Sequence, residues 1–175
     1  CDWFYWRDYF AKLINLLNLG HMKVFIGTDH AGYEMKESLK AFIAELGYEI
    51  EDVGAFEYEK TDDYPEFIAR VARKIQEDPE NHRGIIFGGS GQGEAMTANR
   101  FTGVRATVYY GFSDDIIELS REHNNANVLS LGARFLIEDE AKRVVKKWLS
   151  LDFPAHERHV RRLKMIDEEA QNQDS

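Results

Sequence analysis

A glycine-rich segment near the middle of the chain combines an expected anion-binding loop with a carboxylate. Residues 88–100 are Gly-Gly-Ser-Gly-Gln-Gly-Glu-Ala-Met-Thr-Ala-Asn-Arg and follow a short apolar run at 85–87. A strand, a glycine loop and a helix in this order predict an anion-binding site, because glycines let the backbone approach a ligand and a helix begins with free N–H groups. Glu94 falls in the first turn of the expected helix. An acid at this position is useful if a group near the anion must lose a proton.

Two opposing effects act on the expected acidity of Glu94. A helix N-terminus favours the ionised carboxylate and lowers its pKa, whereas a desolvated pocket raises the pKa. Ser90 lies four residues earlier, so its hydroxyl can face the same pocket. The alternative is that Glu94 is only a charge that stabilises the start of its helix.

Two histidines are placed where they could move protons or bind a ligand. Asp29 and His30 directly follow an expected strand, and Asp29 could orient His30, bind a hydroxyl or simply cap the next helix. His123 ends an expected helix, and an imidazole can take up or release a proton near neutral pH. The alternative for His123 is a histidine favoured by the helix C-terminus.

Arginines gather on one face of the expected C-terminal helix. Arg158, Arg161 and Arg162 recur at steps of three and four residues, so their guanidinium groups should converge. Guanidinium groups bind phosphate in bidentate geometry, which predicts a specific anion site in a chain whose net charge is −9. The alternative is a solvated helix face on which the arginines pair with nearby acids, namely Glu157, Asp167 and Glu168.

Strands alternate with helices over most of the chain and must position these groups. Strands are expected at 23–28, 49–53, 84–87, 105–109 and 128–131, and helices at 33–46, 65–75, after the glycine loop, and at 113–121, 138–149 and 155–170. This pattern predicts a Rossmann-like α/β sandwich of three layers with about five parallel strands. Ligands bind beyond the carboxyl ends of such strands, where residues 29–30, the glycine loop and residues 109–113 fall.

Composition narrows the class of protein. The 175 residues suit one compact domain, and the net charge of −9 argues against a nucleic-acid surface. No apolar run is long enough to span a membrane, and the single cysteine excludes an internal disulfide or a cysteine-based zinc site. His156 and His159 have no further ligands at convincing spacings, so no metal is expected. A cytoplasmic location fits these observations.

Residues 1–21 differ from the remainder of the chain. An apolar stripe recurs at steps of three or four residues and predicts an amphipathic helix, formed by Trp3, Trp6, Phe10, Leu13 and Leu17. Gly20-His21-Met22 resembles a cloning scar, so we expect an appended, non-native peptide at 1–21 and the domain at 22–175. The alternative is a natural extension that packs on its own domain. Residues 3–17 are expected to contact another chain or a partner.

Four sequence blocks together resemble one enzyme family. They are residues 27–32 (GTDHAG), 89–94 followed by 98–100 (GSGQGE and ANR), 121–127 (REHNNAN) and 158–162 (RHVRR). In this order and at these spacings they resemble the ribose-5-phosphate isomerase B family of sugar-phosphate isomerases, from about residue 22 to residue 169. Many relatives carry a cysteine base near the start of the glycine loop. Residues 87–89 contain no thiol, so the chain is similar to the branch that uses a glutamate.

The resemblance implies an aldose–ketose isomerase without metal or cofactor. The reaction would interconvert ribose 5-phosphate and ribulose 5-phosphate through an enediolate, with Glu94 as base and Ser90 beside it. The alternatives are a six-carbon substrate, such as galactose or allose 6-phosphate, or a domain that serves as a carrier scaffold for the N-terminal helix. Deletion of residues 1–21 would separate the last alternative from the enzyme.

The resemblance also implies roles for further residues. His123 would assist ring opening, Asn124 would hold substrate hydroxyls, and Arg134, Arg158 and Arg162 would bind the phosphate. Other substrate-binding positions would be Asp29, His30, Gly89, Gly91, Gln92 and Gly93. Family members build each active site across a homodimer interface, which would bring the arginine-rich helix of one subunit to the glycine loop of the other.

Overall fold

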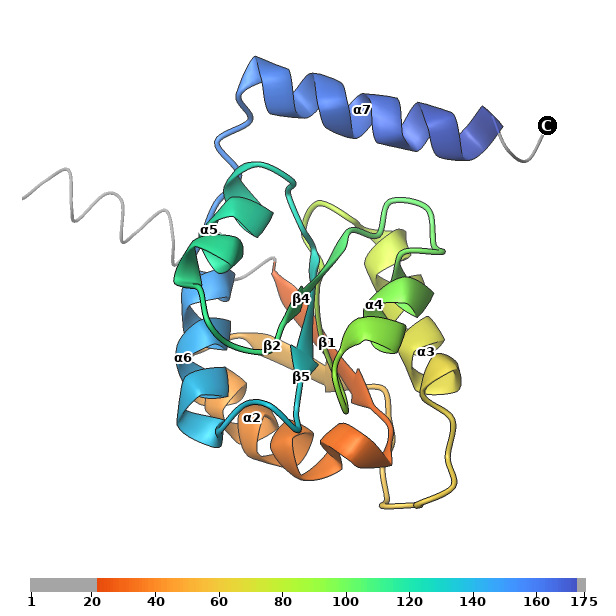
Figure 1. The fold of residues 1–175 in the computed structure, drawn as a ribbon, viewed down its shortest axis with the longest axis vertical. Coiled ribbons are helices and arrows are strands. Elements are labelled where there is room, and N and C mark those ends of the chain that lie inside the picture. Colours follow the sequence, from red (N-terminus) through yellow and green to blue (C-terminus); the bar gives the residue numbers. More distant parts are fainter. Residues whose placement is uncertain (1–21, 173–175) are drawn as a thin grey trace, which may run out of the picture.

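The fold is an α/β sandwich built on one parallel sheet (Figure 1). The computed structural model describes residues 22–172, so the amphipathic helix expected within residues 1–21 lies outside the described residues. The strands are β1 (Lys23–Thr28), β2 (Glu49–Asp52), β3 (Arg83–Gly88), β4 (Ala106–Tyr109) and β5 (Val128–Gly132). All neighbouring strands are parallel, in the order β2-β1-β3-β5-β4, which confirms the predicted five-stranded Rossmann-like fold.

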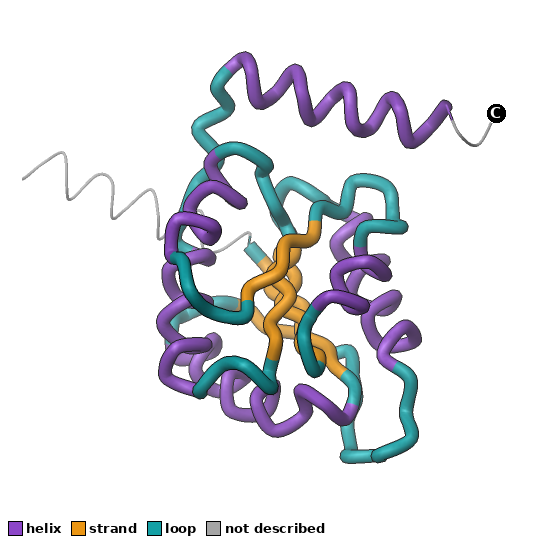
Figure 2. Tube along the Cα trace, viewed as in Figure 1, coloured by secondary structure: helices purple, strands orange, loops and turns teal. Residues whose placement is uncertain are grey.

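Helices cover both faces of the sheet (Figures 1 and 2). The described helices are α2 (Tyr33–Glu45), α3 (Tyr64–Glu77), α4 (Gln92–Ala98), α5 (Asp114–Glu122), α6 (Glu138–Leu149) and α7 (Glu157–Asn172). Side chains of β3 point alternately to the two faces of the sheet and belong to two hydrophobic cores. Ile85 and Phe87 pack with α2, α5 and α6, whereas Ile86 packs with α3. Both faces of the strand are therefore apolar, as burial on both sides requires.

The register of the strands brings their carboxyl ends to one edge of the sheet. Thr28 at the end of β1 pairs with Phe87 of β3, which in turn pairs with Leu131 of β5. The residues that follow β1, β3 and β5 therefore lie next to one another at this edge. This arrangement places residues 29–30 beside the glycine loop, as the sequence predicted.

Element boundaries differ from the expectations by a few residues. The C-terminal helix begins at Glu157 rather than at 155, after Ala155 with a φ of +52°. Ser113 occupies the expected N-cap of α5, but its side chain makes no capping hydrogen bond there. A short 3₁₀ turn, His30–Gly32, precedes α2 and was not predicted.

Helix α7 lies apart from the sandwich, beyond the edge where the strands begin (Figure 1). It follows α6, which starts after the end of β5 and runs back along the sheet, so α7 emerges at the opposite edge from the glycine loop. Among the described residues, none of the helices combines the length and apolar character that a membrane crossing needs.

Candidate active site

Five of the predicted site residues gather at the edge where the strands end. They follow three neighbouring strands: Asp29 and His30 come after β1, Ser90 and Glu94 after β3, and Arg134 after β5. We call these five residues the strand-end cluster. Because parallel strands deliver their following loops to a common edge, residues separated by more than a hundred positions become neighbours.

Glu94 is a buried carboxylate rather than a surface charge. Its side chain belongs to the first turn of α4, yet the residue is only 5% exposed. Burial raises the pKa of Glu94, the nearby Asp29 carboxylate raises it further, and Arg134 opposes the shift. Of the two opposing effects expected from the sequence, desolvation is therefore the stronger. A carboxylate with a raised pKa is a better proton acceptor than an ordinary surface glutamate.

Gly88 makes the space that the Glu94 carboxylate occupies. A Cβ atom added at position 88 would lie 1.8 Å from Oε1 of Glu94. A residue with a side chain at this position, cysteine included, would have to displace the carboxylate. A side chain at position 88 and the observed placement of the Glu94 carboxylate therefore exclude one another.

The burial of Glu94 predicts a stability effect that depends on pH. Because the pKa is raised on folding, the folded state binds more protons than the unfolded state between the ordinary and the raised value. The free energy of unfolding therefore falls as pH rises through that window. We expect Glu94→Gln to be more stable than the parent protein at neutral pH, and the advantage to vanish below the ordinary pKa of glutamate.

Thermal unfolding at several pH values tests this expectation. Glu66→Gln is the control, because Glu66 also lies in the first turn of a helix but is exposed and paired with Arg70, so its replacement should bring no gain of stability at neutral pH. A Glu94→Gln protein that is less stable than the parent at neutral pH would show that the carboxylate has favourable partners in the fold.

The other residues of the glycine loop adopt the geometry of a tight connection. Gly91 has a φ of +78° and is the N-cap of α4, and its carbonyl oxygen accepts a 2.6 Å hydrogen bond from the hydroxyl of Ser130. The Ser90 hydroxyl accepts the backbone N–H of Gln92 at 3.4 Å, so its own hydrogen can be donated elsewhere. Gln92 is exposed, and Gly93 follows it within α4.

Asp29 caps the 3₁₀ turn that precedes α2, whereas the alternative expected from the sequence was a cap on the helix itself, whose N-cap is Gly32. One carboxylate oxygen accepts the backbone N–H of Ala31 at 2.9 Å, and Asp29 is the N-cap of the 3₁₀ turn. The other oxygen lies 3.8 Å from Nδ1 of His30, which is too long for a hydrogen bond. Burial raises the pKa of Asp29. Asp29 therefore lies at ion-pair distance from the His30 ring but does not hold it by a hydrogen bond.

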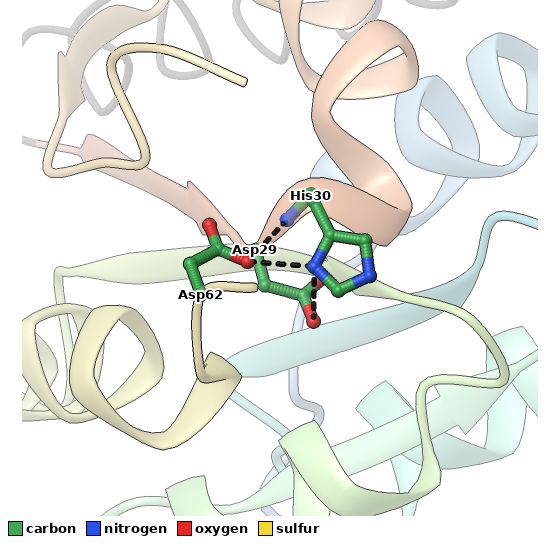
Figure 3. A group of neighbouring side chains, drawn as sticks. All are labelled: Asp29, His30 and Asp62. Carbon is green, nitrogen blue, oxygen red and sulfur yellow. Dashed lines mark hydrogen bonds and ion pairs between the residues drawn. The ribbon is translucent and has the colours of Figure 1, made fainter. Parts of the chain in front are cut away.

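The carboxylate that holds His30 belongs to Asp62, a residue that was not among those expected to form the site. Oδ1 of Asp62 lies 2.6 Å from Nδ1 of His30 and also accepts the backbone N–H of His30 at 3.0 Å (Figure 3). Donor atoms of Asp29, His30 and Asp62 lie within 4.8 Å of one another, a spacing that a cation site would also show. Because Oδ1 of Asp62 already engages two nitrogen atoms of His30, the group is better described as a hydrogen-bonded network.

A cavity opens beside the strand-end cluster. Its volume is about 430 Å³, in the size range of small-ligand pockets, and its walls include His30, Tyr58 and Arg134. The guanidinium of Arg134 also lies against Gly89, since a Cβ atom there would meet it at 3.2 Å. Ser90 and Glu94 are not among the lining residues, so Arg134 links the cavity to the glycine loop.

The remaining predicted residues form a second group at the opposite edge of the sheet. His123 is the C-cap of α5, and its ring stacks on that of His159 with centroids 4.2 Å apart. The side chain of Arg158 donates from Nε to Nε2 of His159 at 3.0 Å. We call His123, Asn124, Arg158, His159 and Arg162 the histidine–arginine cluster.

The electrostatics of the histidine–arginine cluster favour an anion. Burial lowers the pKa of His159, and His123, Arg158 and Arg162 lower it further. A neutral His159 agrees with its role as acceptor from Arg158. Within residues 22–172, no carboxylate forms an ion pair with Arg158, Arg161 or Arg162, so the pairing expected for a solvated helix face does not occur there. The positive charge on this face is thus uncompensated within the described part of the chain.

The two clusters do not meet within one chain. His123 and Asn124 precede β5, and α7 follows α6, so both lie where the strands begin, whereas Glu94 lies where they end (Figure 1). A strand of five residues spans roughly 17 Å, and the two clusters lie beyond opposite ends of such strands. The structure therefore brings together Asp29, His30, Ser90, Glu94 and Arg134, and leaves Arg158 and Arg162 apart from them.

Comparison with known proteins gives a consistent result. Residues 24–166 match the sequence model of the family described as Ribose/Galactose Isomerase. A ribose-5-phosphate isomerase B from Mycolicibacterium paratuberculosis is 37% identical over 147 residues, which cover 84% of this chain and 91% of that protein. The same-named protein of Escherichia coli is 35% identical over 82% of this chain and 93% of its own length.

The fold has similar solved counterparts. The crystal structure of ribose-5-phosphate isomerase B from Mycoplasma genitalium with bound ribulose-5-phosphate superposes with a TM-score of 0.81 at 33% identity, and the match covers 86% of this chain and 99% of that one.

Proposed function

The chain belongs to the Ribose/Galactose Isomerase family, and we propose that it is an isomerase that interconverts ribose 5-phosphate and ribulose 5-phosphate. The observation that carries the proposal is the buried Glu94 carboxylate, held against Gly88 at the edge where parallel strands end. Similar proteins named ribose-5-phosphate isomerase B support the choice of substrate, as does the relative with bound ribulose-5-phosphate.

Glu94 is the proposed base for proton transfer between C2 and C1 of the open-chain sugar. It removes the proton from C2 of the aldose, so that the C1–C2 double bond of an enediolate forms and negative charge develops on O1. The proton of the C2 hydroxyl then passes to O1, and Glu94 returns its proton to C1 as O2 becomes the carbonyl oxygen of the ketose. The Ser90 hydroxyl can donate a hydrogen bond to the oxygen on which negative charge develops. Burial of Glu94 supports this role, because it keeps the proton on the carboxyl group between the two transfers.

A second copy of the chain is proposed to complete each active site. In a homodimer with twofold symmetry, the histidine–arginine cluster of one subunit faces the strand-end cluster of the other, twice. His123 then assists ring opening, Asn124 holds hydroxyls, and Arg158 and Arg162 bind the phosphate together with Arg134. The separation of the two clusters within one chain supports this arrangement, since neither contains all the groups that the reaction needs.

Exposed apolar side chains near both clusters also support association. Phe112 is 97% exposed in the loop after β4, and Phe135 and Ile137 after β5 are 64% and 70% exposed. Helix α7 carries a second set, Val160, Met165 and Ile166. Large apolar side chains exposed close to a functional site are typical of protein interfaces, and these two sets are candidates for opposite sides of the same contact.

An isomerase assay across sugar phosphates tests the proposed function. We expect a higher kcat/KM for ribose 5-phosphate than for allose 6-phosphate or galactose 6-phosphate. Deletion of residues 1–21 is the matched control and should leave turnover unchanged if that segment is an appended peptide. Preference for a six-carbon substrate would replace ribose 5-phosphate by that sugar phosphate within the same family. Absence of turnover with every sugar phosphate would reject the proposed isomerase function.

A further inference from the structure

Asp62 has no part in the roles that the family resemblance implied, yet it is the closest partner of His30. We propose that Asp62 is a positioning residue for the proposed isomerisation: it holds His30 with Nδ1 protonated and turned from the cavity, so that Nε2 can accept a hydrogen bond from a hydroxyl of the sugar phosphate. The inference rests on the proposed function for the identity of the substrate, whereas the position and tautomer of the imidazole do not depend on that function.

The geometry around Asp62 restricts His30 at two points. A single carboxylate oxygen, Oδ1, lies 2.6 Å from the ring nitrogen Nδ1 and 3.0 Å from the backbone nitrogen of the same residue. These contacts fix the ring relative to its own main chain. The Asp62 side chain is only 9% exposed, so water competes weakly for the bond. Asp62 therefore holds both the position and the rotation of the imidazole.

The identity of the partner decides which ring nitrogen carries the proton. An ionised carboxylate can only accept hydrogen bonds, so Nδ1 must be the donor in this contact. In a neutral imidazole the other nitrogen, Nε2, is then an acceptor. Figure 3 shows Nε2 on the side of the ring away from Asp62, and His30 is one of the residues that line the cavity.

Of the three neighbours Asp29, Tyr58 and Asp62, it is Asp62 that forms a hydrogen bond with the His30 ring. Oδ2 of Asp29 is 3.8 Å from Nδ1, and Oδ1 of Asp29 already accepts the N–H of Ala31. The ring of Tyr58 meets that of His30 edge to face, with centroids 6.3 Å apart, so it packs against the imidazole without a hydrogen bond being formed. Neither neighbour replaces the bond to Asp62.

Nitrogen NMR of the full-length protein tests the tautomer without any substrate. Long-range ¹H–¹⁵N spectra distinguish a protonated from an unprotonated ring nitrogen, and a His30→Asn variant assigns the His30 signals. We expect Nδ1 protonated and Nε2 unprotonated in the parent protein, a mixture of tautomers in Asp62→Ala, and the parent tautomer in Asp62→Asn, whose amide oxygen can still accept. Asp63→Asn is the matched control, because Asp63 is exposed and its side chain makes no capping hydrogen bond.

Kinetics then connect the tautomer with the substrate. Without Asp62, Nε2 of His30 is no longer held as an acceptor for the sugar, and loss of this neutral hydrogen bond should raise KM for ribose 5-phosphate roughly two- to tenfold in Asp62→Ala, and less in Asp62→Asn. Asp63→Asn should leave KM unchanged. A purely structural role would lower the amount of folded protein without changing the tautomer of the molecules that remain folded.

Several results would overturn the inference. One is a parent protein with Nε2 protonated, and another is an Asp62→Ala protein that keeps both the parent tautomer and the parent KM. If Asp62→Ala does not fold, the test relies on Asp62→Asn. The Nδ1 proton of His30 should be strongly deshielded in the parent protein, because it is bonded to a carboxylate, and its chemical shift should move upfield in Asp62→Asn. An unchanged chemical shift of this proton rejects the proposal. Absence of isomerase activity in the parent protein would reject the proposed function instead, while the tautomer result would still stand.

Discussion

Replacement of Glu94 by glutamine is expected to lower kcat for ribose 5-phosphate by at least about a hundredfold, the lower range for loss of general-base catalysis. Glutamine has nearly the same shape as glutamate but cannot accept the C2 proton. Its amide should fit the space against Gly88 that the carboxylate fills. The fold and the binding of substrate should therefore be preserved, so KM should change little while turnover falls.

The same control as in the stability experiment applies to this measurement. Glu66→Gln removes an exposed carboxylate from the first turn of α3 and should retain full turnover. Near-normal turnover in Glu94→Gln would assign the base to another group, and Asp29 would then be the nearest carboxylate to examine, since its charge acts on Glu94.

Two inactive variants are expected to restore activity when they are combined in one dimer. The first is Glu94→Gln, and the second is the double variant Arg158→Ala/Arg162→Ala, which should raise KM because each guanidinium contact to phosphate contributes about 1.5–3 kcal/mol. In a mixed dimer, the intact Glu94 of one subunit faces the intact arginines of the other at one of the two sites. A heterodimer purified through two different tags should therefore show about half of the parent activity per dimer.

Complementation of this kind separates a shared site from a site within one chain. If Glu94, Arg158 and Arg162 acted together inside one subunit, every subunit of the mixed dimer would carry a defect and no activity would return. Lys164→Ala is the matched control for the arginine variant, because Lys164 also lies on α7 and forms only an exposed ion pair with Glu168 within residues 22–172, at 3.5 Å. It should leave KM unchanged.

The sequence by itself determined those features of this protein that depend on residues close together along the chain. Apolar periodicity and turn residues predicted the alternation of strands and helices, and the boundaries of α6 matched the expected range of 138–149. Placement of Glu94 in the first turn of a helix also followed from sequence, since it depends on residues within four positions of one another. The order of the elements predicted that residues 29–30 and the glycine loop would meet, because parallel strands share one carboxyl edge.

Only the tertiary structure decided properties that depend on contacts between distant residues. The bond between His30 and Asp62 joins residues 32 positions apart, and the stacking of His123 on His159 joins two separate segments. The pKa of Glu94 is raised because the folded chain buries its carboxylate and brings the charge of Asp29 near it from another loop, and no local pattern encodes either effect. The opposite placement of α7 and Glu94 likewise follows from the path of the whole chain across the sheet, because each helix returns the chain to the edge where the next strand begins.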